Sequence, residues 1–208
     1  LYCFINQRIK FIMPFTTIKK PSDYFNTKLY TGNGSTQSIT GVGHAPNLIW
    51  IKARNDTANH TLTDAVRGTN SVLYANQNYA QDTPTNAITS FDSDGFSLGS
   101  NGSFNQNSTS YCSWNWKANG AGVANTDGSI TSTVSANTTA GFSIVSYTGT
   151  GSAATVGHGL GSVPKMMIIK NRTNTQGFAT YHHTQGAGHF IDLSSDNSGQ
   201  AGSSIFNN

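Results

Sequence analysis

Apolar and polar residues alternate along most of the chain, in short runs separated by Gly, Asn, Asp and Ser. No window keeps the i, i+3, i+4 apolar spacing of an amphipathic helix. The alternating runs predict strands at 24–31, 47–54, 70–75, 87–91, 95–99, 110–117, 130–135, 141–147, 164–171, 178–182 and 189–193. This pattern predicts an all-β protein.

Two of these runs, LIWIK at 48–52 and MMIIK at 166–170, are apolar on both faces, as the central strands of a sandwich are. The segment FDSDGFSL at 91–98 predicts a hairpin with Asp-Gly in its turn. Many short strands with frequent turns favour a β-sandwich or jelly roll.

The chain also repeats itself. YTGNGS at 30–35 recurs as YTGTGS at 147–152, and HAPNLIWIKARN at 44–55 recurs as SVPKMMIIKNRT at 162–173. The offset changes from 117 to 118 in the Gly-rich turn between them and then stays constant. A register fixed over about 60 residues predicts an internal duplication.

The repeat divides the chain into four segments. Residues 1–12 are a leader outside the repeat, which we expect to be disordered, and Met13 is a candidate start. A first β-sandwich unit follows at 13–120, then a Gly/Asn-rich linker at 121–128 and a second unit at 129–208. The second copy has no counterparts of FDSDGFSLG and YCSWNWKANG, so we expect a sandwich that is truncated at its C-terminal end.

Charge excludes some partners. Charged residues make up 10% of the chain, and all nine acidic residues are Asp. Four of the twelve basic residues lie in the first 20 positions, so the rest of the chain has a net charge near zero. A nucleic-acid surface needs basic residues clustered on the fold itself, which argues against that partner.

No apolar run is long enough for a membrane helix, and Cys3 and Cys112 do not suggest a disulfide framework.

The segment HTLTDAVRG at 60–68 contains the first candidate ligand-binding residues, His60, Asp64 and Arg67. A carboxylate, a guanidinium and an imidazole suit sugar hydroxyls or acidic sugars. The alternative is an Asp64–Arg67 ion pair that only pins the loop. The second unit has Phe178, His182 and Gln185 at the equivalent positions, so the scaffold does not require the trio.

A second candidate surface lies on the predicted strand 110–117. Tyr111, Ser113, Asn115 and Lys117 share one face, opposite Cys112, Trp114 and Trp116. We expect the Trp face to be buried and the Tyr/Asn/Lys face to be wet. Tyr111 and Asn115 are therefore further candidate glycan contacts.

Catalytic and metal sites are not indicated. With no Glu in the chain, no carboxylate pair of the glycosidase kind is evident, and there is no Gly-x-Ser-x-Gly elbow. His182 and His183 are adjacent on a strand and point to opposite faces, so with His189 they are predicted to be surface residues. Asp92 and Asp94 lack the other ligands of a calcium loop. We expect no catalytic residues, no metal and no cofactor.

Taken together, FNTKLYTGNGSTQSITGVG, PNLIWIKARN, HTLTDAVRG, FDSDGFSLGS, WNWKANG and SIVSYTGTGSAATVGHGLGSVPKMMIIKNR resemble tail-associated virion proteins of marine bacteriophages that carry tandem concanavalin A-like, LamG-like domains. The resemblance covers residues 13–208. It implies a concanavalin A-like jelly-roll sandwich and a place in the virion, outside the cell.

The expected function is that of a non-enzymatic virion structural protein, a tail fibre or tail-tip component with lectin-like binding of host-surface glycans. Its other partners would be further virion proteins and copies of itself. Two alternatives stay open: a polysaccharide-degrading enzyme on the same fold, and a purely structural spacer repeat.

Overall fold

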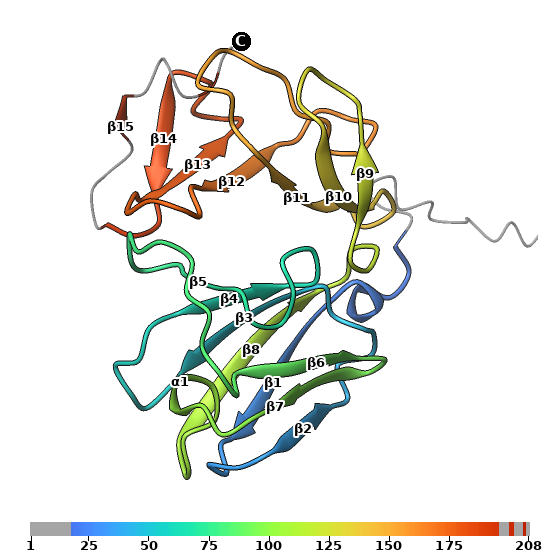
Figure 1. Cartoon of the computed structure of the whole chain (residues 1–208). Coiled ribbons are helices and arrows are strands. Elements are labelled where there is room, and N and C mark those ends of the chain that lie inside the picture. The colour runs from blue at the N-terminus through green and yellow to red at the C-terminus, as the bar shows by residue number, and fades with distance from the viewer. Residues whose placement is uncertain (1–17, 196–199, 202–205, 207–208) are drawn as a thin grey trace, which may run out of the picture.

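The computed structural model describes residues 18–195, 200, 201 and 206, so the leader at 1–12 lies outside the described residues. The described chain forms two halves, one above the other (Figure 1). Every pair of named strands is antiparallel. The expectation of an all-β fold is confirmed.

The lower half contains a five-stranded sheet of order β1-β8-β3-β4-β5 and a three-stranded sheet of order β2-β7-β6. The strands of the larger sheet are β1 (Phe25–Thr31), β8 (Ser110–Trp116), β3 (Leu48–Ala53), β4 (Thr61–Asp64) and β5 (Val72–Tyr74). Those of the smaller are β2 (Gln37–Thr40), β7 (Gly95–Leu98) and β6 (Ile88–Asp92). The 3-10 helix η1 (Pro21–Asp23) precedes β1, and the one-turn helix α1 (Gly102–Asn105) precedes β8.

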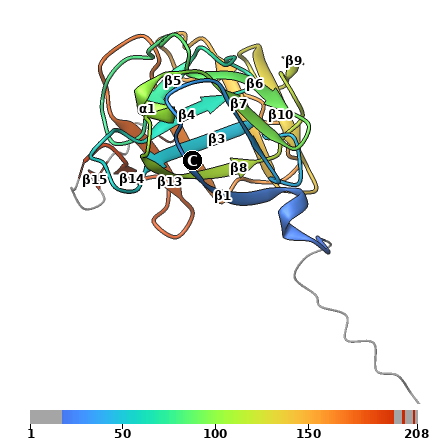
Figure 2. The same ribbon diagram turned by 90° about the horizontal axis from the view of Figure 1, so that it is seen from below.

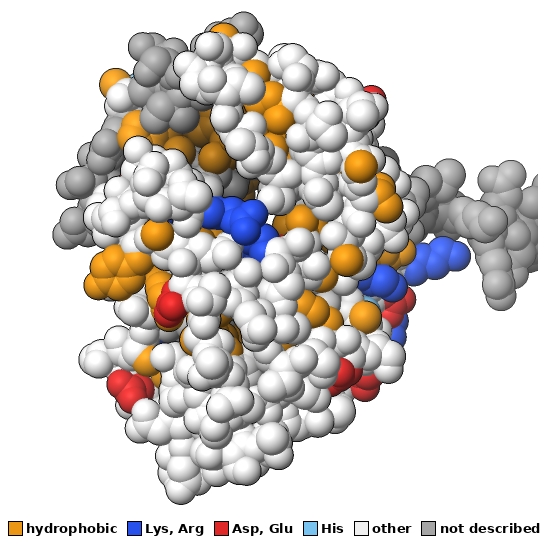
Figure 3. Space-filling model, viewed as in Figure 1, with side chains coloured by type: hydrophobic (Ala, Val, Ile, Leu, Met, Phe, Trp, Pro, Cys, Tyr) orange, Lys and Arg blue, Asp and Glu red, His pale blue; other side chains and the backbone are white. Residues whose placement is uncertain are grey.

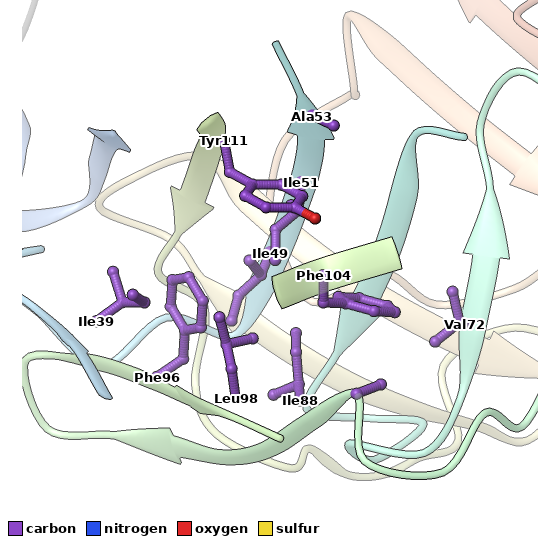
Figure 4. Close-up of a cluster of buried hydrophobic side chains, with 11 residues drawn as sticks. Ile39, Ile49, Ile51, Ala53, Val72, Ile88, Phe96, Leu98, Phe104 and Tyr111 are labelled. Carbon is purple, nitrogen blue, oxygen red and sulfur yellow. The ribbon is translucent and has the colours of Figure 1, made fainter. Parts of the chain in front are cut away.

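The core of the lower half lies between its two sheets. Along β3, Ile49 and Ile51 are each 1% exposed while their neighbours Leu48 and Trp50 are half-buried, because alternate side chains of a strand point to opposite faces. Figure 4 shows the isoleucines from β3 opposite Phe96 and the other apolar side chains of the smaller sheet. Seen from below, β6 and β7 cross over the larger sheet (Figure 2). This half is a β-sandwich.

The upper half consists of a sheet of order β11-β10-β9 and a sheet of order β12-β13-β14-β15. Their strands are β9 (Val123–Asn125), β10 (Ser132–Asn137), β11 (Phe142–Tyr147), β12 (Met166–Lys170), β13 (Phe178–His182), β14 (His189–Asp192) and β15 (Gln200–Ala201). Residues 121–128 were expected to be only a linker, but β9 lies within them and pairs with β10. Val123 is 68% exposed, so β9 has no buried alternating face that a pattern search could detect.

Strand pairing in the two halves follows the same offset. Leu48 pairs with Asp64 in the lower half, and Met166 pairs with His182 in the upper half. Both residues of the second pair lie 118 positions after those of the first. β3 and β1 are joined through β8, whereas β12 and β11 belong to separate sheets.

The second face of the five-stranded sheet packs against the upper half. Leu62, Leu73 and Ala75 form an apolar cluster with Phe178, and Trp116 stacks on Phe142 with ring centroids 6.3 Å apart. Both faces of the sheet are therefore covered. No helix among the described residues is long and apolar enough to cross a membrane.

Candidate functional site

Asp64 and Arg67 form a buried ion pair. Arg67 Nε donates to Asp64 Oδ2 at 2.5 Å, and each side chain is 6% exposed. Asp64 Oδ1 also accepts the backbone N–H groups of Val66 at 3.1 Å and Arg67 at 2.9 Å. In these hydrogen bonds the charged groups of Asp64 and Arg67 have partners within the segment 64–67 itself. Of the two interpretations, the ion pair that pins the loop is the one that the structure contains.

The ion pair belongs to a chain of hydrogen bonds between the two halves. Arg67 Nη1 donates to Gln81 Oε1 at 3.3 Å, and Arg172 Nε donates to the same oxygen at 2.8 Å. Arg172 Nη1 then donates to Ser146 Oγ in β11 at 2.9 Å. Figure 3 shows Lys and Arg side chains gathered where the halves meet. Arg67 therefore supports the junction between the halves.

His60 is hydrogen-bonded to a tryptophan. Trp50 Nε1 donates to His60 Nδ1 at 3.0 Å, and the two rings are edge to face with centroids 5.9 Å apart. Burial, with a smaller contribution from Lys52, lowers the pKa of His60. A neutral imidazole is the form that can accept this bond at Nδ1.

Tyr111 and Asn115 lie in the core, so the prediction that this face of the strand is exposed to solvent is wrong. Tyr111 is 1% exposed, and its hydroxyl donates to the Gly102 carbonyl at 2.8 Å. Asn115 is fully buried, and its Nδ2 donates to the Asn26 carbonyl at 3.1 Å. The three-stranded sheet covers this face. Trp114, on the opposite face, is half-buried and lies edge to face with Trp50, while Trp116 on the same face stacks on Phe142 of the upper half.

A surface hollow of about 460 Å³ lies on the lower half, at the loops on either side of β5 and the start of β6. Sequence reasoning missed this hollow, which we call the Thr/Asn hollow. Its lining residues are Thr69, Asn70, Thr83, Pro84, Thr85, Asn86, Ile88 and Thr89. Within the described residues, no hydrogen bond is found for the polar side chains of this lining. The run TPTNAIT at 83–89 was the only signal in the sequence.

The floor of the Thr/Asn hollow is fixed by the backbone. Asn86 has a φ of 55°, a left-handed conformation that Asn tolerates better than most residues. Its carbonyl accepts the Asn101 N–H at 2.9 Å, and Asn101 Nδ2 donates to the Thr85 carbonyl at 3.1 Å. A Cβ on Gly99 would lie 2.5 Å from the Asn86 carbonyl oxygen, so Gly permits this close approach. The loop therefore presents its side chains from a constrained backbone.

The other candidate ionisable groups have local partners. Asp94 accepts the N–H groups of Gly43 at 2.6 Å and Gly41 at 3.0 Å, which lower its pKa. Asp92 accepts hydrogen bonds from the hydroxyl groups of Ser90 and Ser97. His182 Nδ1 lies 2.7 Å from the Thr184 hydroxyl. In the described ranges no group of three His, Cys or Asp side chains is placed to hold a metal ion.

Comparison with known proteins places the chain in a family without assigning a function. No curated protein and no solved structure matches it. A family model matches residues 20–208, which is most of the chain. The chain therefore belongs to the DUF7483 family, described as a domain of unknown function.

Proposed function

We propose that the protein is a non-enzymatic phage virion component, in a tail fibre or tail tip, that binds neutral glycans of the host surface. The sequence resemblance to tail-associated proteins supports the location and a concanavalin A-like jelly-roll fold. The Thr/Asn hollow carries the proposal for the ligand, because several exposed polar side chains without internal partners line it.

The lining of the Thr/Asn hollow suits a polyhydroxylated ligand. Threonine hydroxyls and asparagine amides both donate and accept hydrogen bonds, as sugar hydroxyls require. Pro84 provides the apolar contact that the C–H face of a sugar ring uses, whereas Ile88, which is 1% exposed, belongs to the core beneath. No charged side chain lines the hollow. We therefore infer a neutral sugar.

The environments of the Asp residues support binding without hydrolysis. A glycosidase places two carboxyl groups on either side of the bond that it cleaves. Asp64 is paired with Arg67, Asp92 and Asp94 hold turns, and Asp192 accepts the N–H of Phe178 at 3.0 Å. Each of these carboxylates already has a structural partner. The polysaccharide-degrading alternative would have to use one of them or an exposed carboxylate such as Asp56, Asp82 or Asp127.

A spacer is the second candidate function. Arg172 and Gln81 link the halves through a side-chain and a backbone hydrogen bond, each of 2.8 Å. A firm junction is what a length-setting repeat needs. Such a spacer would show no saturable binding of any glycan.

A glycan array probed with the intact chain tests the proposal. Wild type should bind a set of neutral bacterial oligosaccharides, and the variant Thr85→Val/Thr89→Val should bind them at least about fivefold more weakly, since each of the two lost hydrogen bonds removes about 0.5–1.5 kcal/mol. Thr40→Val, at an exposed position on β2, is the matched control. Absence of binding would favour the spacer, and release of reducing sugar would favour the enzyme.

A further inference from the structure

The chain contains three Asn-Gly pairs, at 33–34, 101–102 and 119–120. An asparagine before glycine can lose its side-chain amide, because the glycine nitrogen can attack the asparagine Cγ and glycine has no side chain to hinder the attack. The reaction needs a side-chain amide that can turn and a glycine N–H that no acceptor holds. The three pairs differ in both respects.

The amide of Asn33 is held by hydrogen bonds. Its Nδ2 donates to the Thr36 carbonyl at 3.1 Å, and its Oδ1 accepts the Ser35 N–H at 2.8 Å and Asn105 Nδ2 at 3.1 Å. The Gly34 N–H donates to the Asn105 carbonyl at 2.8 Å, so the attacking nitrogen is held as well. Attack at this pair requires these hydrogen bonds to break.

Asn101 is fixed as the N-cap of α1. Its Oδ1 accepts the Ser103 N–H at 3.0 Å, and its Nδ2 donates to the Thr85 carbonyl at 3.1 Å. Turning this amide for attack by the Gly102 nitrogen would break both side-chain hydrogen bonds and remove the cap. This pair is therefore protected by its place in the fold.

Asn119 has neither restraint. It is exposed, and within the described residues no hydrogen bond is found for its side-chain amide or for the Gly120 N–H. Gly120 has a φ of 67°, and no atom lies within 4 Å of the place where a Cβ would be. Ser135 Oγ accepts the Asn119 N–H and donates to the Gly120 carbonyl, each at 2.8 Å. Neither of these two bonds uses the Gly120 N–H.

We propose that Asn119 is a site of spontaneous deamidation. The Gly120 nitrogen forms a bond to Cγ of Asn119, the bond from Cγ to Nδ2 breaks, and the amide group leaves as ammonia with the proton of the Gly120 N–H. Water then opens the succinimide. Opening at Cγ gives aspartate, and opening at the main-chain carbonyl gives isoaspartate, whose main chain is one methylene longer.

Isoaspartate at this position weakens the link between the halves. Residues 117–122 connect β8 of the lower half to β9 of the upper half. The longer main chain separates the N–H of residue 119 from the Gly120 carbonyl, the two groups that Ser135 Oγ now binds. Ser135 lies in β10, which pairs with both β9 and β11. Deamidation therefore detaches this turn from the central strand of its sheet.

The test is incubation of the intact chain at about pH 8, followed by mass spectrometry with fragment spectra. Asn119 should be deamidated, and Asn33 and Asn101 should react at least about fivefold more slowly, because two or more hydrogen bonds must break first. In guanidinium chloride the three pairs should react at similar rates. An intact Asn119, equal rates in the folded chain, or a preference for Asn119 that persists in the unfolded chain would overturn the proposal.

Hydrogen exchange tests the consequence for the fold. Exchange at 132–137 should become faster in the incubated wild type and stay unchanged in incubated Asn119→Gln. Glutamine is the matched control, because its longer side chain forms the corresponding ring slowly and the Asn119 amide has no partner in the described structure to lose. Equal exchange in the two incubated proteins would contradict the detachment of the turn.

Discussion

Arg172 and Gln81 hold each other at two points across the boundary between the halves. Arg172 Nε donates to Gln81 Oε1, and the Gln81 N–H donates to the Arg172 carbonyl, each at 2.8 Å. Gln81 follows β5 in the lower half, and Arg172 follows β12 in the upper half. Because Gln81 also accepts from Arg67, this contact joins the buried ion pair to the upper sheets.

Gln81→Ala should loosen the upper half and leave the lower core intact. The variant loses the hydrogen bonds that Gln81 Oε1 accepts from Arg172 and from Arg67, and a bond to a charged donor contributes about 1.5–3 kcal/mol. Hydrogen exchange should become faster at 178–192 and stay unchanged at 48–53. Gln77→Ala is the matched control, because Gln77 Nε2 bonds to Asn59 within the lower half at 3.1 Å. Equal exchange at 178–192 in the two variants would count against this role.

Arg67→Ala should destabilise the protein strongly. It leaves the Asp64 carboxylate buried without its cation, which typically costs about 3–5 kcal/mol. Urea unfolding measures the loss. Lys20→Ala is the control, since it breaks the pair of Lys20 with Asp23, whose side chains are 67% and 47% exposed, and exposed pairs contribute at most about 1 kcal/mol. Similar losses in both variants would show that the burial of Asp64 and Arg67 does not govern the result.

Acidification should weaken the protein through His60. Its pKa is lowered in the folded state, mainly by burial, so the unfolded chain binds a proton first as the pH falls. The contribution of His60 to stability is therefore complete above its ordinary pKa of about 6.5 and is lost as the pH falls through the lowered value. Protonation of Nδ1 also removes the acceptor for Trp50. His60→Gln should flatten the decline in unfolding free energy between pH 7 and pH 5, and an unchanged slope would exclude His60 as the cause.

Most strands could be predicted from the sequence because alternation records which residues a sheet buries. The predicted ranges miss β2, β4, β9 and β15, which have only two to four residues each and are too short for an alternating pattern. β3 falls inside the predicted range 47–54, and β8 falls inside 110–117. Alternation divides Tyr111 and Trp114 between two faces but does not tell which face a second layer covers. In this chain both faces are covered, one by the three-stranded sheet and one by the upper half. The sequence could not indicate that.

The candidate site was harder to predict than the strands. Charged residues drew attention to Asp64 and Arg67, whose spacing fits an ion pair as well as a ligand site. The Thr/Asn hollow has no charge and no motif, and its shape depends on the left-handed conformation of Asn86. The Asn86 carbonyl accepts the Asn101 N–H and the Ala87 carbonyl accepts the Gly99 N–H, so residues outside this loop hold its backbone in place.

A titration followed by NMR tests the proposed glycan site most directly. The intact ¹⁵N-labelled chain would be titrated with the neutral oligosaccharide that binds best on the array. The largest amide shifts should occur at 69, 70, 83 and 85–89, since Pro84 has no amide N–H. Asn86→Gly, which keeps the backbone conformation but removes the amide side chain, should raise the Kd by about tenfold, as expected for the loss of about 1.4 kcal/mol. Saturable shifts confined to other residues, or an unchanged Kd in Asn86→Gly, would contradict a glycan site at the Thr/Asn hollow.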